Sequence, residues 1–372
     1  MTASSGCALI RSDRVGFFDP YPDPYFVVVE REPVNISEAT RKCVAFIGIR
    51  EAGHFQPRAT CFFVSYLEDQ HSFDHLVTAE HVVSGLLSQG HDIWLRVNVK
   101  GGGSAEIPLE ADAFRFHPDN ERNPTDVAVC PINLRLVNEQ DNSSSGEMDV
   151  RTIGLNGEQS LIPTEKWVNR HGGLGGQIAI VGLFRNHFGK DRNIPIVRVG
   201  NISAKPEEPV WTKYTGYLKA YLVEARSIAG LSGSPVFVMP DYALYVMRAL
   251  ERRSQKDSSV EAAAGLLGLM HGHFDVRNLN EDVVLDSGPE RSVHTGIGVV
   301  IPVEKIIEAV EHPELTAMRK KVVADLRKDG ATPDVVTVDK ADGPLTTDEN
   351  PQHREDFTSL LGKAARTPPQ DD

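Results

Sequence analysis

A turn of small residues, Gly-Leu-Ser-Gly-Ser-Pro at 230–235, separates two segments that are typical of β-strands, 221–226 and 236–238. Glycine adopts backbone conformations that other residues avoid, so the glycines of this turn can expose the hydroxyl of Ser232 and aim nearby amides at one point. A serine attacks a carbonyl group only when a base lies beside it and donors stabilise the oxyanion that forms. Clusters of Gly, Ser and Pro also build ordinary turns, so a catalytic interpretation requires a base and its partner elsewhere in the chain.

Two segments nearer the N-terminus supply these groups. His81 follows a β-rich apolar run and precedes a helix-like one, within Leu-Val-Thr-Ala-Glu-His-Val-Val at 76–83, and Asp126 directly precedes an apolar, strand-like run. With Asp126 orienting His81, and His81 accepting the proton of Ser232, the three residues predict acyl transfer to water. The backbone amides of Gly230 and Ser232 are the expected oxyanion hole.

The three segments resemble those of trypsin-like serine peptidases, especially the bacterial Deg-type proteases and glutamyl endopeptidases. In that family Thr-Ala-x-His carries the base, Asp-x-Ala followed by Val or Leu carries the carboxylate, and Gly-x-Ser-Gly followed by Gly or Ser and then Pro carries the nucleophile. Two later segments, 268–272 and 296–303, resemble the strand that lines the specificity pocket and the strand before the C-terminal helix. The resemblance covers roughly 43–313 and implies a serine endopeptidase that needs no cofactor and acts on protein or peptide substrates.

The resemblance also implies an all-β fold of two six-stranded antiparallel β-barrels, a chymotrypsin-like double barrel. A length of 372 residues allows one such catalytic unit with tails. We therefore predict five parts: an N-terminal extension over 1–35, a first β-barrel over 36–137 carrying His81 and Asp126, an inter-barrel linker over 138–160, a second β-barrel over 161–313 carrying Ser232 and a short closing helix, and a flexible tail over 314–372.

The second half of the chain carries six strand-like runs, each bounded by turn or charged residues. Apolar residues at helical spacing over 302–311 predict the closing helix. Beyond 313, charged residues and prolines leave too little apolar surface to offset the entropy of ordering, which predicts the tail. The six runs lie at 177–184, 194–199, 217–225, 236–238, 265–273 and 296–302.

Composition limits the classes of binding partner that the chain is expected to have. The chain carries 52 Asp and Glu against 39 Lys and Arg, a net charge of −13, which disfavours a general affinity for nucleic acid or anionic membranes. It has no run of about 18 apolar residues and no basic start, so we expect a soluble, cytoplasmic protein. The oligomeric state stays open. Four cysteines are expected to be reduced and mostly buried: Cys7, Cys43, Cys61 and Cys130.

Substrate specificity is predicted from the same resemblance, which places Arg226 at the base of the specificity pocket and His271, Gly272 and His273 along its wall. A cationic base with nearby imidazoles complements an acidic side chain, so we predict a weak preference for Glu or Asp before the scissile bond. The alternative for Arg226 is an ordinary surface arginine. His271-x-His273-x-Asp275 could also suggest a metal site, but no further ligand accompanies it, and we expect no metal.

Two features bear on activation and on the competing class of function. Leu231 stands where zymogen-activated members of the family carry an aspartate, so activation by a new N-terminus is not expected. A chain that folds directly to an active form, or one gated by the charged insertion at 247–264 or by a partner, fits better. The alternative function is a pseudoprotease that uses the double barrel as a binding module, and the presence of all three triad residues argues against it.

Overall fold

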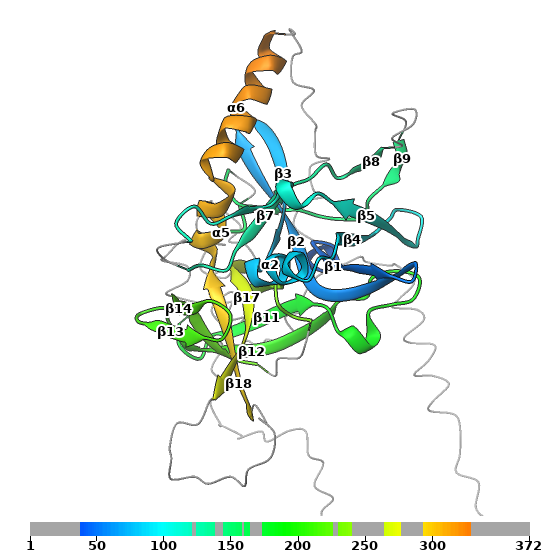
Figure 1. Cartoon of the computed structure of the whole chain (residues 1–372). Coiled ribbons are helices and arrows are strands. Elements are labelled where there is room, and N and C mark those ends of the chain that lie inside the picture. The colour runs from blue at the N-terminus through cyan, green and yellow to red at the C-terminus, as the bar shows by residue number, and fades with distance from the viewer. Residues whose placement is uncertain are drawn as a thin grey trace, which may run out of the picture.

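The computed structural model describes residues 38–120, 124–137, 144–157, 160–163, 173–225, 230–239, 264–276 and 293–328. They form two β units, one before residue 160 and one after residue 173, and two helices that follow the last strand (Figure 1). The predicted extension at 1–35 and the insertion at 247–263 lie outside the described residues. None of the described helices is long and apolar enough to cross a membrane.

The first β unit is one sheet of eight strands in the order β5-β4-β1-β2-β3-β7-β6, with β10 pairing along β2. Cys61 and Phe63 of β2 pack into the core of this unit, whereas Phe62 and Val64 face a cluster shared with the second unit. Both faces of β2 are therefore buried. The strands are β1 Val44–Glu51, β2 His54–Glu68, β3 His71–Thr78, β4 Ile93–Asn98, β5 Ser104–Leu109, β6 Arg115–Phe116, β7 Ala128–Pro131 and β10 Ile153–Gly154.

The second β unit is a closed barrel of six strands in the order β11-β12-β15-β18-β17-β16, as predicted. Alternate residues such as Ile178 and Ile180 of β11 point into its core, together with Val236 and Val238 of β16. The predicted run at 217–225 divides between β14 and β15. The barrel strands are β11 Gln177–Gly182, β12 Ile196–Ala204, β15 Tyr221–Glu224, β16 Pro235–Val238, β17 Gly265–Val276 and β18 Val293–Pro302.

Shorter elements complete the two units. β13 (Pro209–Thr212) and β14 (Gly216–Lys219) form a separate hairpin between β12 and β15, and β8 (Arg135–Val137) and β9 (Ser144–Glu147) form another. The described helices before the barrel are α1 (Glu38–Arg41), α2 (Glu80–Ser88) and η1 (Ala111–Ala113), and η2 (Arg185–His187) lies between β11 and β12.

The predicted fold class, a chymotrypsin-like double barrel, is confirmed, but two details of the first half differ. Its strands pair into an eight-stranded sheet and not into a closed six-stranded barrel. The predicted linker at 138–160 contributes β9 and β10 to pairing in its described part, because Ile153 and Leu155 are buried against the first unit. Polar composition concealed these two strands.

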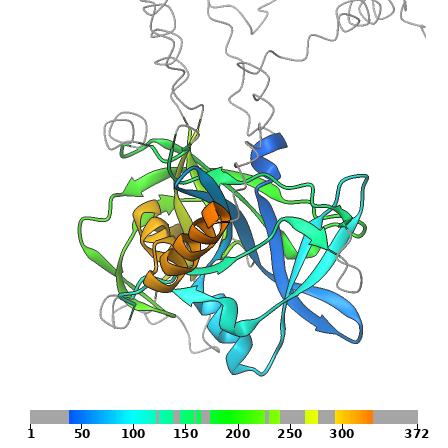
Figure 2. The same ribbon diagram turned by 90° about the horizontal axis from the view of Figure 1, so that it is seen from above.

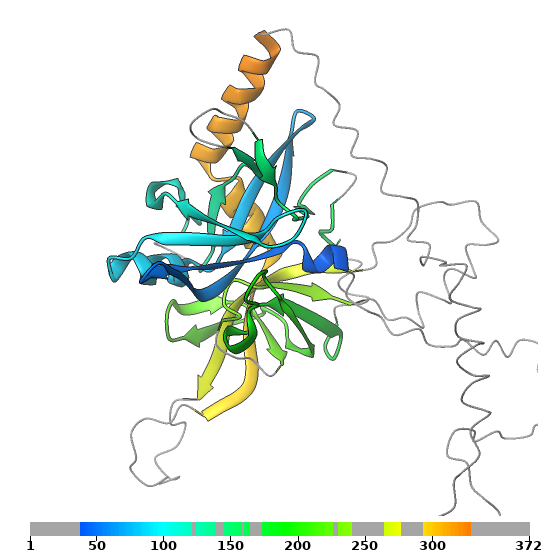
Figure 3. The same cartoon turned by 90° about the vertical axis from the view of Figure 1, so that its right-hand side faces the viewer.

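In Figures 1 and 3, α6 extends past the end of the first unit, beside the long strands β2 and β3, and in the view from above in Figure 2 the C-terminal helices lie in front of part of the molecule. The closing helix is confirmed as α5 (Val303–Val310), with Val303, Ile306 and Val310 buried. The predicted tail is wrong at its start, because Pro313–Lys328 forms α6.

The sequence of α6 is highly charged, yet every fourth residue along one stripe is buried: Leu315, Arg319 and Val323. The guanidinium of Arg319 is fully buried. It donates to the Val310 carbonyl at 2.8 Å and to the Thr316 hydroxyl at 3.1 Å, and it lies 4.6 Å from the centroid of the Tyr66 ring. A buried arginine thus takes the place of an apolar residue, which explains why the apolar pattern missed this helix.

Two side chains of β4 connect the two units through hydrogen bonds. Arg96, which is 4% exposed, donates to the carbonyls of Gly189 at 2.9 Å and Lys190 at 2.7 Å in the second half of the chain. The amide of Asn193 donates to Asn98 Oδ1 at 2.6 Å, and Asn98 Nδ2 donates to the Asn193 carbonyl at 3.1 Å. These bonds fix the relative position of the units that carry the two halves of the site.

Three of the four cysteines lie in the described residues, and all three are free and buried. Burial raises the pKa of Cys43 to about 12 and of Cys130 to about 11, and it also raises the pKa of Cys61. These thiols therefore behave as small apolar core residues, as predicted. Cys7 lies outside the described residues.

Candidate active site

His81 enters the site from the first turn of α2, directly after β3 ends at Thr78. The strand is held in place on its neighbour, because the Thr78 hydroxyl donates to the Thr60 carbonyl at 2.8 Å. The side chain of His81 remains 16% exposed, so one edge of the imidazole is accessible. The backbone of His81 is therefore held between a buried strand and a short helix, while part of its imidazole ring is exposed.

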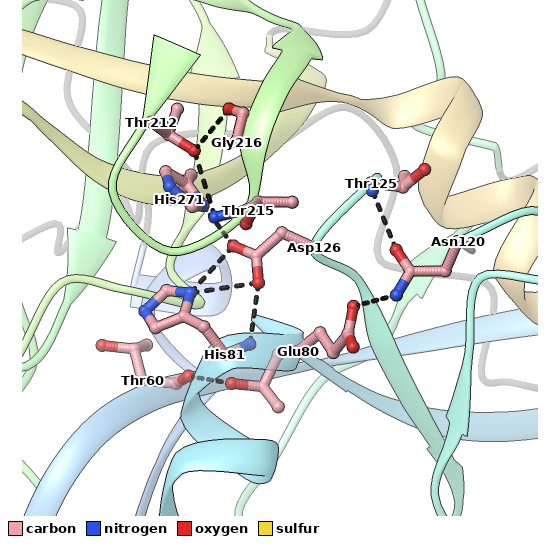
Figure 4. Close-up of polar contacts among 11 residues, drawn as sticks. Thr60, Glu80, His81, Asn120, Thr125, Asp126, Thr212, Thr215, Gly216 and His271 are labelled. Carbon is pink, nitrogen blue, oxygen red and sulfur yellow. Dashed lines mark hydrogen bonds and ion pairs between the residues drawn. The ribbon is translucent and has the colours of Figure 1, made fainter. Parts of the chain in front are cut away.

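Asp126 lies immediately before β7 and is 1% exposed. Its backbone is left-handed, with φ 60°, a conformation that Asp adopts more readily than most residues. The preceding loop is held by Asn120, whose side chain accepts from the Thr125 amide at 2.9 Å and donates to Glu80 at 2.6 Å (Figure 4). Glu80 precedes His81 in α2, so one network positions both the carboxylate and the base.

His81 and Asp126 form the pair that the sequence predicts. His81 Nδ1 lies 3.0 Å from Asp126 Oδ1 and 2.9 Å from Oδ2, and the backbone amide of His81 donates to Oδ1 at 2.8 Å (Figure 4). Burial alone raises the pKa of Asp126, but the charge of His81 and hydrogen bonds from His271 and His81 outweigh it and hold the pKa well below its usual range. An ionised carboxylate accepts from Nδ1–H, which leaves His81 Nε2 as the basic nitrogen.

Ser232 lies in the turn directly before β16, and hydrogen bonds connect its loop to both β units. The Thr60 amide donates to the Ser232 carbonyl at 3.0 Å, and the Gly233 amide donates to the Met270 carbonyl at 2.8 Å. Thr60 is bonded to Thr78, close to His81, so the loop is anchored beside the base. Within the described residues, no hydrogen bond joins the Ser232 hydroxyl to His81.

The predicted oxyanion hole is held by its carbonyl groups and its core contacts. The Thr60 hydroxyl donates to the Gly230 carbonyl at 2.8 Å and accepts from the Leu183 amide at 2.9 Å. Gly230 has φ 105°, which only glycine adopts without strain, and Leu231 is buried in the core of the second barrel. In the described part of the chain the amides of Gly230 and Ser232 donate no backbone hydrogen bond, so both are available to an oxyanion.

His271 is placed differently from the prediction. Its side chain is 2% exposed, and its Nδ1 hydrogen bonds to Asp126 Oδ2 instead of facing a substrate pocket (Figure 4). The cause is a β-bulge: Met270 pairs with Val300 and Gly272 with Val299, so His271 is an extra residue in β17. A bulge redirects a side chain, and simple strand alternation could not predict that direction.

Of the other predicted pocket residues, Gly272 and His273 lie within the described part of β17. A side chain added at Gly272 would meet no atom within 4 Å, so space is open beside this backbone, and His273 is partly exposed in β17. The predicted pocket base, Arg226, lies outside the described residues. A role of these residues in substrate binding stays a prediction.

Tyr214 completes the site and was not predicted. It lies at the tip of the β13–β14 hairpin, and its ring stacks on that of His81 with the centroids 4.7 Å apart and the planes 5° apart. The Tyr214 side chain is nevertheless 65% exposed. The segment Lys-Tyr-Thr-Gly at 213–216 predicts a turn at most, because nothing in the sequence indicates that this hairpin reaches the histidine.

The three groups His81, Asp126 and His271 could also hold a metal ion, since their ligand atoms lie within 4.8 Å of one another. Metal binding needs both imidazoles unprotonated at the ligating nitrogen. In the observed contacts each Nδ1 instead faces the carboxylate at hydrogen-bond distance, and an N–H donor at each position satisfies the carboxylate fully. Hydrogen bonding therefore accounts for the arrangement, and no chemical step below requires an ion.

Comparison with known proteins gives a distant likeness in fold. No protein-family model and no curated relative matches the sequence. Among solved structures, the chain is similar to the MamO protease domain from Magnetospirillum magneticum, with 15% identity over 73% of this chain and 96% of that one at a TM-score of 0.42. For Deg5 the identity is 14% over 72% of this chain and 87% of that one, at a TM-score of 0.38. For the HtrA-type protease AlgW with a tripeptide the identity is 18% over 73% of this chain and 60% of that one, at a TM-score of 0.37.

One of these structures is named as an HtrA-type protease and another as a protease domain, and each is a protein to which this chain is similar. At these identities and TM-scores the roles of individual residues are argued from the geometry of this site alone.

Proposed function

We propose that this protein is a serine endopeptidase that hydrolyses peptide bonds through an acyl-enzyme intermediate. The observation that carries the proposal is the pairing of His81 Nδ1 with the buried, ionised Asp126 at 2.9 Å. This pairing fixes the imidazole as the tautomer whose Nε2 accepts a proton. The loop that carries the proposed nucleophile is anchored to Thr60, which also accepts a hydrogen bond from Thr78, three residues before His81.

The reaction follows from these groups. His81 Nε2 takes the proton of Ser232 as Oγ forms a bond to the substrate carbonyl carbon, and the amides of Gly230 and Ser232 stabilise the oxyanion. The tetrahedral adduct expels the amine, which receives the proton from His81. Water then attacks the ester by the reverse use of the same groups, and Ser232 regains its proton. Asp126 stabilises the imidazolium that forms in both halves of the reaction.

Ser232 and His81 are both among the described residues and are not hydrogen bonded to each other, so the proposed reaction requires a movement that brings them together. Such hydrogen bonds are often long or absent without substrate and form in the complex. The same observation favours the second candidate function, a pseudoprotease whose double barrel binds partners without hydrolysis. The intact base and carboxylate pair distinguishes our first choice, because a binding module has no need of a buried charge at this position.

The expected partners are protein or peptide substrates, and we propose no nucleic acid, membrane or cofactor partner and a cytoplasmic location. An acidic preference now depends on Arg226 and His273, since His271 is occupied by Asp126. The weak acidic preference stays a prediction.

A mixed peptide library tests the proposal. The wild-type chain is expected to cleave it, Ser232→Ala to abolish cleavage, and Ser234→Ala, which changes a fully buried hydroxyl two residues away, to retain it. Equal cleavage by wild type and Ser232→Ala would assign the activity to a contaminant and leave the binding module as the better description. The residues preceding the cleaved bonds report the specificity, and predominance of apolar or basic residues would end the acidic-pocket prediction alone.

A further inference from the structure

Asp126 has a second imidazole partner besides the base, and the two imidazoles approach it from opposite halves of the chain. His81 comes from α2 of the first unit, and His271 comes from β17 of the second (Figure 4). The carboxylate accepts from the His81 amide, from His81 Nδ1 and from His271 Nδ1. With Asp126 1% and His271 2% exposed, water does not compete for these bonds.

We propose that His271 is a positioning residue of the active site, which acts on His81 through Asp126 and couples the triad to the nucleophile loop. The inference rests on the proposed function for its kinetic consequences. Its structural basis, a His81–Asp126–His271 relay of hydrogen bonds, stands on the contacts alone.

The first part of the argument concerns protons. A carboxylate only accepts, so each imidazole bonded to it must carry a proton on Nδ1. His271 is therefore a fixed donor that holds Asp126 Oδ2 while Oδ1 accepts the backbone amide of His81. The carboxylate cannot rotate without losing one of these bonds. Its plane, and with it the direction of the bond to His81, is set by His271.

The second part concerns the strand that carries His271. Its neighbour Met270 is bonded to the nucleophile loop in both directions, because the Gly233 amide donates to the Met270 carbonyl and the Met270 amide donates to the Ser234 carbonyl, each at 2.8 Å. His271 is the bulged residue that follows at once. Two adjacent residues of β17 therefore connect the serine loop to the carboxylate: Met270 is bonded to the loop and His271 to Asp126.

The third part concerns charge. The groups facing His271 are Asp126, the His81 ring at 5.2 Å between centroids and the Tyr214 ring at 6.3 Å. One carboxylate can neutralise one imidazolium. Catalysis requires that imidazolium on His81, so a positive His271 would compete with it for Asp126 and weaken the base. The role we assign to His271 is therefore that of a hydrogen-bond donor to Asp126 and not of a second cation beside it.

Three substitutions test the inference. His271→Asn keeps an N–H near the position of Nδ1 but cannot ionise, whereas His271→Gln moves the amide toward the position of Nε2, and His271→Leu removes the donor at similar size. Loss of a hydrogen bond to a charged group predicts that kcat falls about 10–100-fold in Leu and Gln, with KM little changed, and stays within about threefold in Asn.

A second readout does not require activity. In ¹⁵N-histidine-labelled Ser232→Ala protein, two low-field Nδ1–H proton signals are expected, from His81 and His271, and both are expected to be lost in an added Asp126→Ala change. His271→Leu should remove one signal and shift the other. Two signals without hydrolysis by the wild-type chain would overturn the proposed function and keep the relay. A single signal, or unchanged kcat in both His271→Leu and His271→Gln, would overturn the positioning role.

Discussion

The phenol ring of Tyr214 stacks on the imidazole of His81, with centroids 4.7 Å apart and planes 5° apart, although the two residues come from different β units. The hairpin that carries Tyr214 pairs with no other strand in the described structure. Leu218 and Val210 pack the hairpin against the core, and the ring contact joins its tip to His81, the proposed base.

We expect Tyr214→Ala to lower kcat/KM by about 3–10-fold, since a stacked aromatic pair contributes about 1 kcal/mol. Tyr214→Phe keeps the ring and should retain activity. Tyr217→Ala is the matched control, because Tyr217 lies in the same hairpin and is equally exposed, at 68% against 65%. A rise in activity for Tyr214→Ala would instead identify Tyr214 as a cover over His81.

Asp126→Asn tests the charge of the carboxylate with its shape retained. Asparagine also tolerates the left-handed backbone at this position, so the loop should fold normally. The amide carries no charge and favours the wrong tautomer of His81, which predicts a loss of about 10⁴ in kcat. Retention of more than about a tenth of wild-type kcat would contradict the role of Asp126.

The same substitution has a pH signature in stability. Because the folded-state pKa of Asp126 lies below its unfolded value of about 3.9, ionisation stabilises the fold above that pH and the contribution is lost as the pH falls through the folded-state pKa. The Tm difference between wild type and Asp126→Asn should therefore shrink as the pH is lowered from about 7 to about 3. A difference that is constant over this range would mean that the carboxylate is not preferentially ionised in the fold.

For Asp74 we predict the opposite dependence of stability on pH. Burial raises the pKa of Asp74 to about 6, so its contribution to stability is present below the unfolded value and is lost as the pH rises through 6. Asp74→Asn should stabilise the chain at pH 8 by about 1–2 kcal/mol, after allowance for partial exposure, and have little effect at pH 4. Asp112→Asn, at an exposed position, is the control for a general effect of charge. Urea unfolding at the two pH values measures both.

Gly233→Ala tests the packing of the nucleophile loop. Gly233 has φ 82°, and an added Cβ would collide with the Thr60 carbonyl and the Thr78 hydroxyl. Gly216, at φ 75° in the β13–β14 hairpin, offers a matched control, because its added Cβ would meet nothing. Left-handed backbone alone costs about 1–2 kcal/mol, so Gly216→Ala should lose that much, while Gly233→Ala should lose more and abolish activity. Equal losses in the two variants would show that the loop yields at Thr60.

Arg319 determines whether α6 belongs to the folded domain. Arg319→Ala removes a fully buried guanidinium with two close hydrogen bonds and leaves Tyr66 without its cation, so we expect a loss of about 3–5 kcal/mol in unfolding free energy. Exposed Lys320 is the control, and Lys320→Ala should change stability by less than about 0.5 kcal/mol. A neutral Arg319→Ala would mean that the helix does not contribute.

The parts of this structure that follow from local pattern were predicted, and the parts that depend on contact between distant segments were not. The six barrel strands follow from apolar runs, and the His81–Asp126 pair from two short motifs. The α6 helix was missed because Arg319 fills a core position. The sequence motifs predict that His271 lines the pocket. The structure differs because a β-bulge, which depends on pairing with β18, turns the side chain toward Asp126. Tyr214 reaches His81 through tertiary packing that no spacing in the sequence records.

The central claim is that Ser232 is a nucleophile activated by His81 and Asp126. The most direct measurement is the intact mass of the folded protein after reaction with a fluorophosphonate, followed by peptide mapping. The account predicts one phosphonyl group per chain, on Ser232, at a rate that drops sharply in Asp126→Asn and with no labelling of Ser232→Ala. An unmodified mass for the folded wild-type protein, or a label on any other residue, would contradict it.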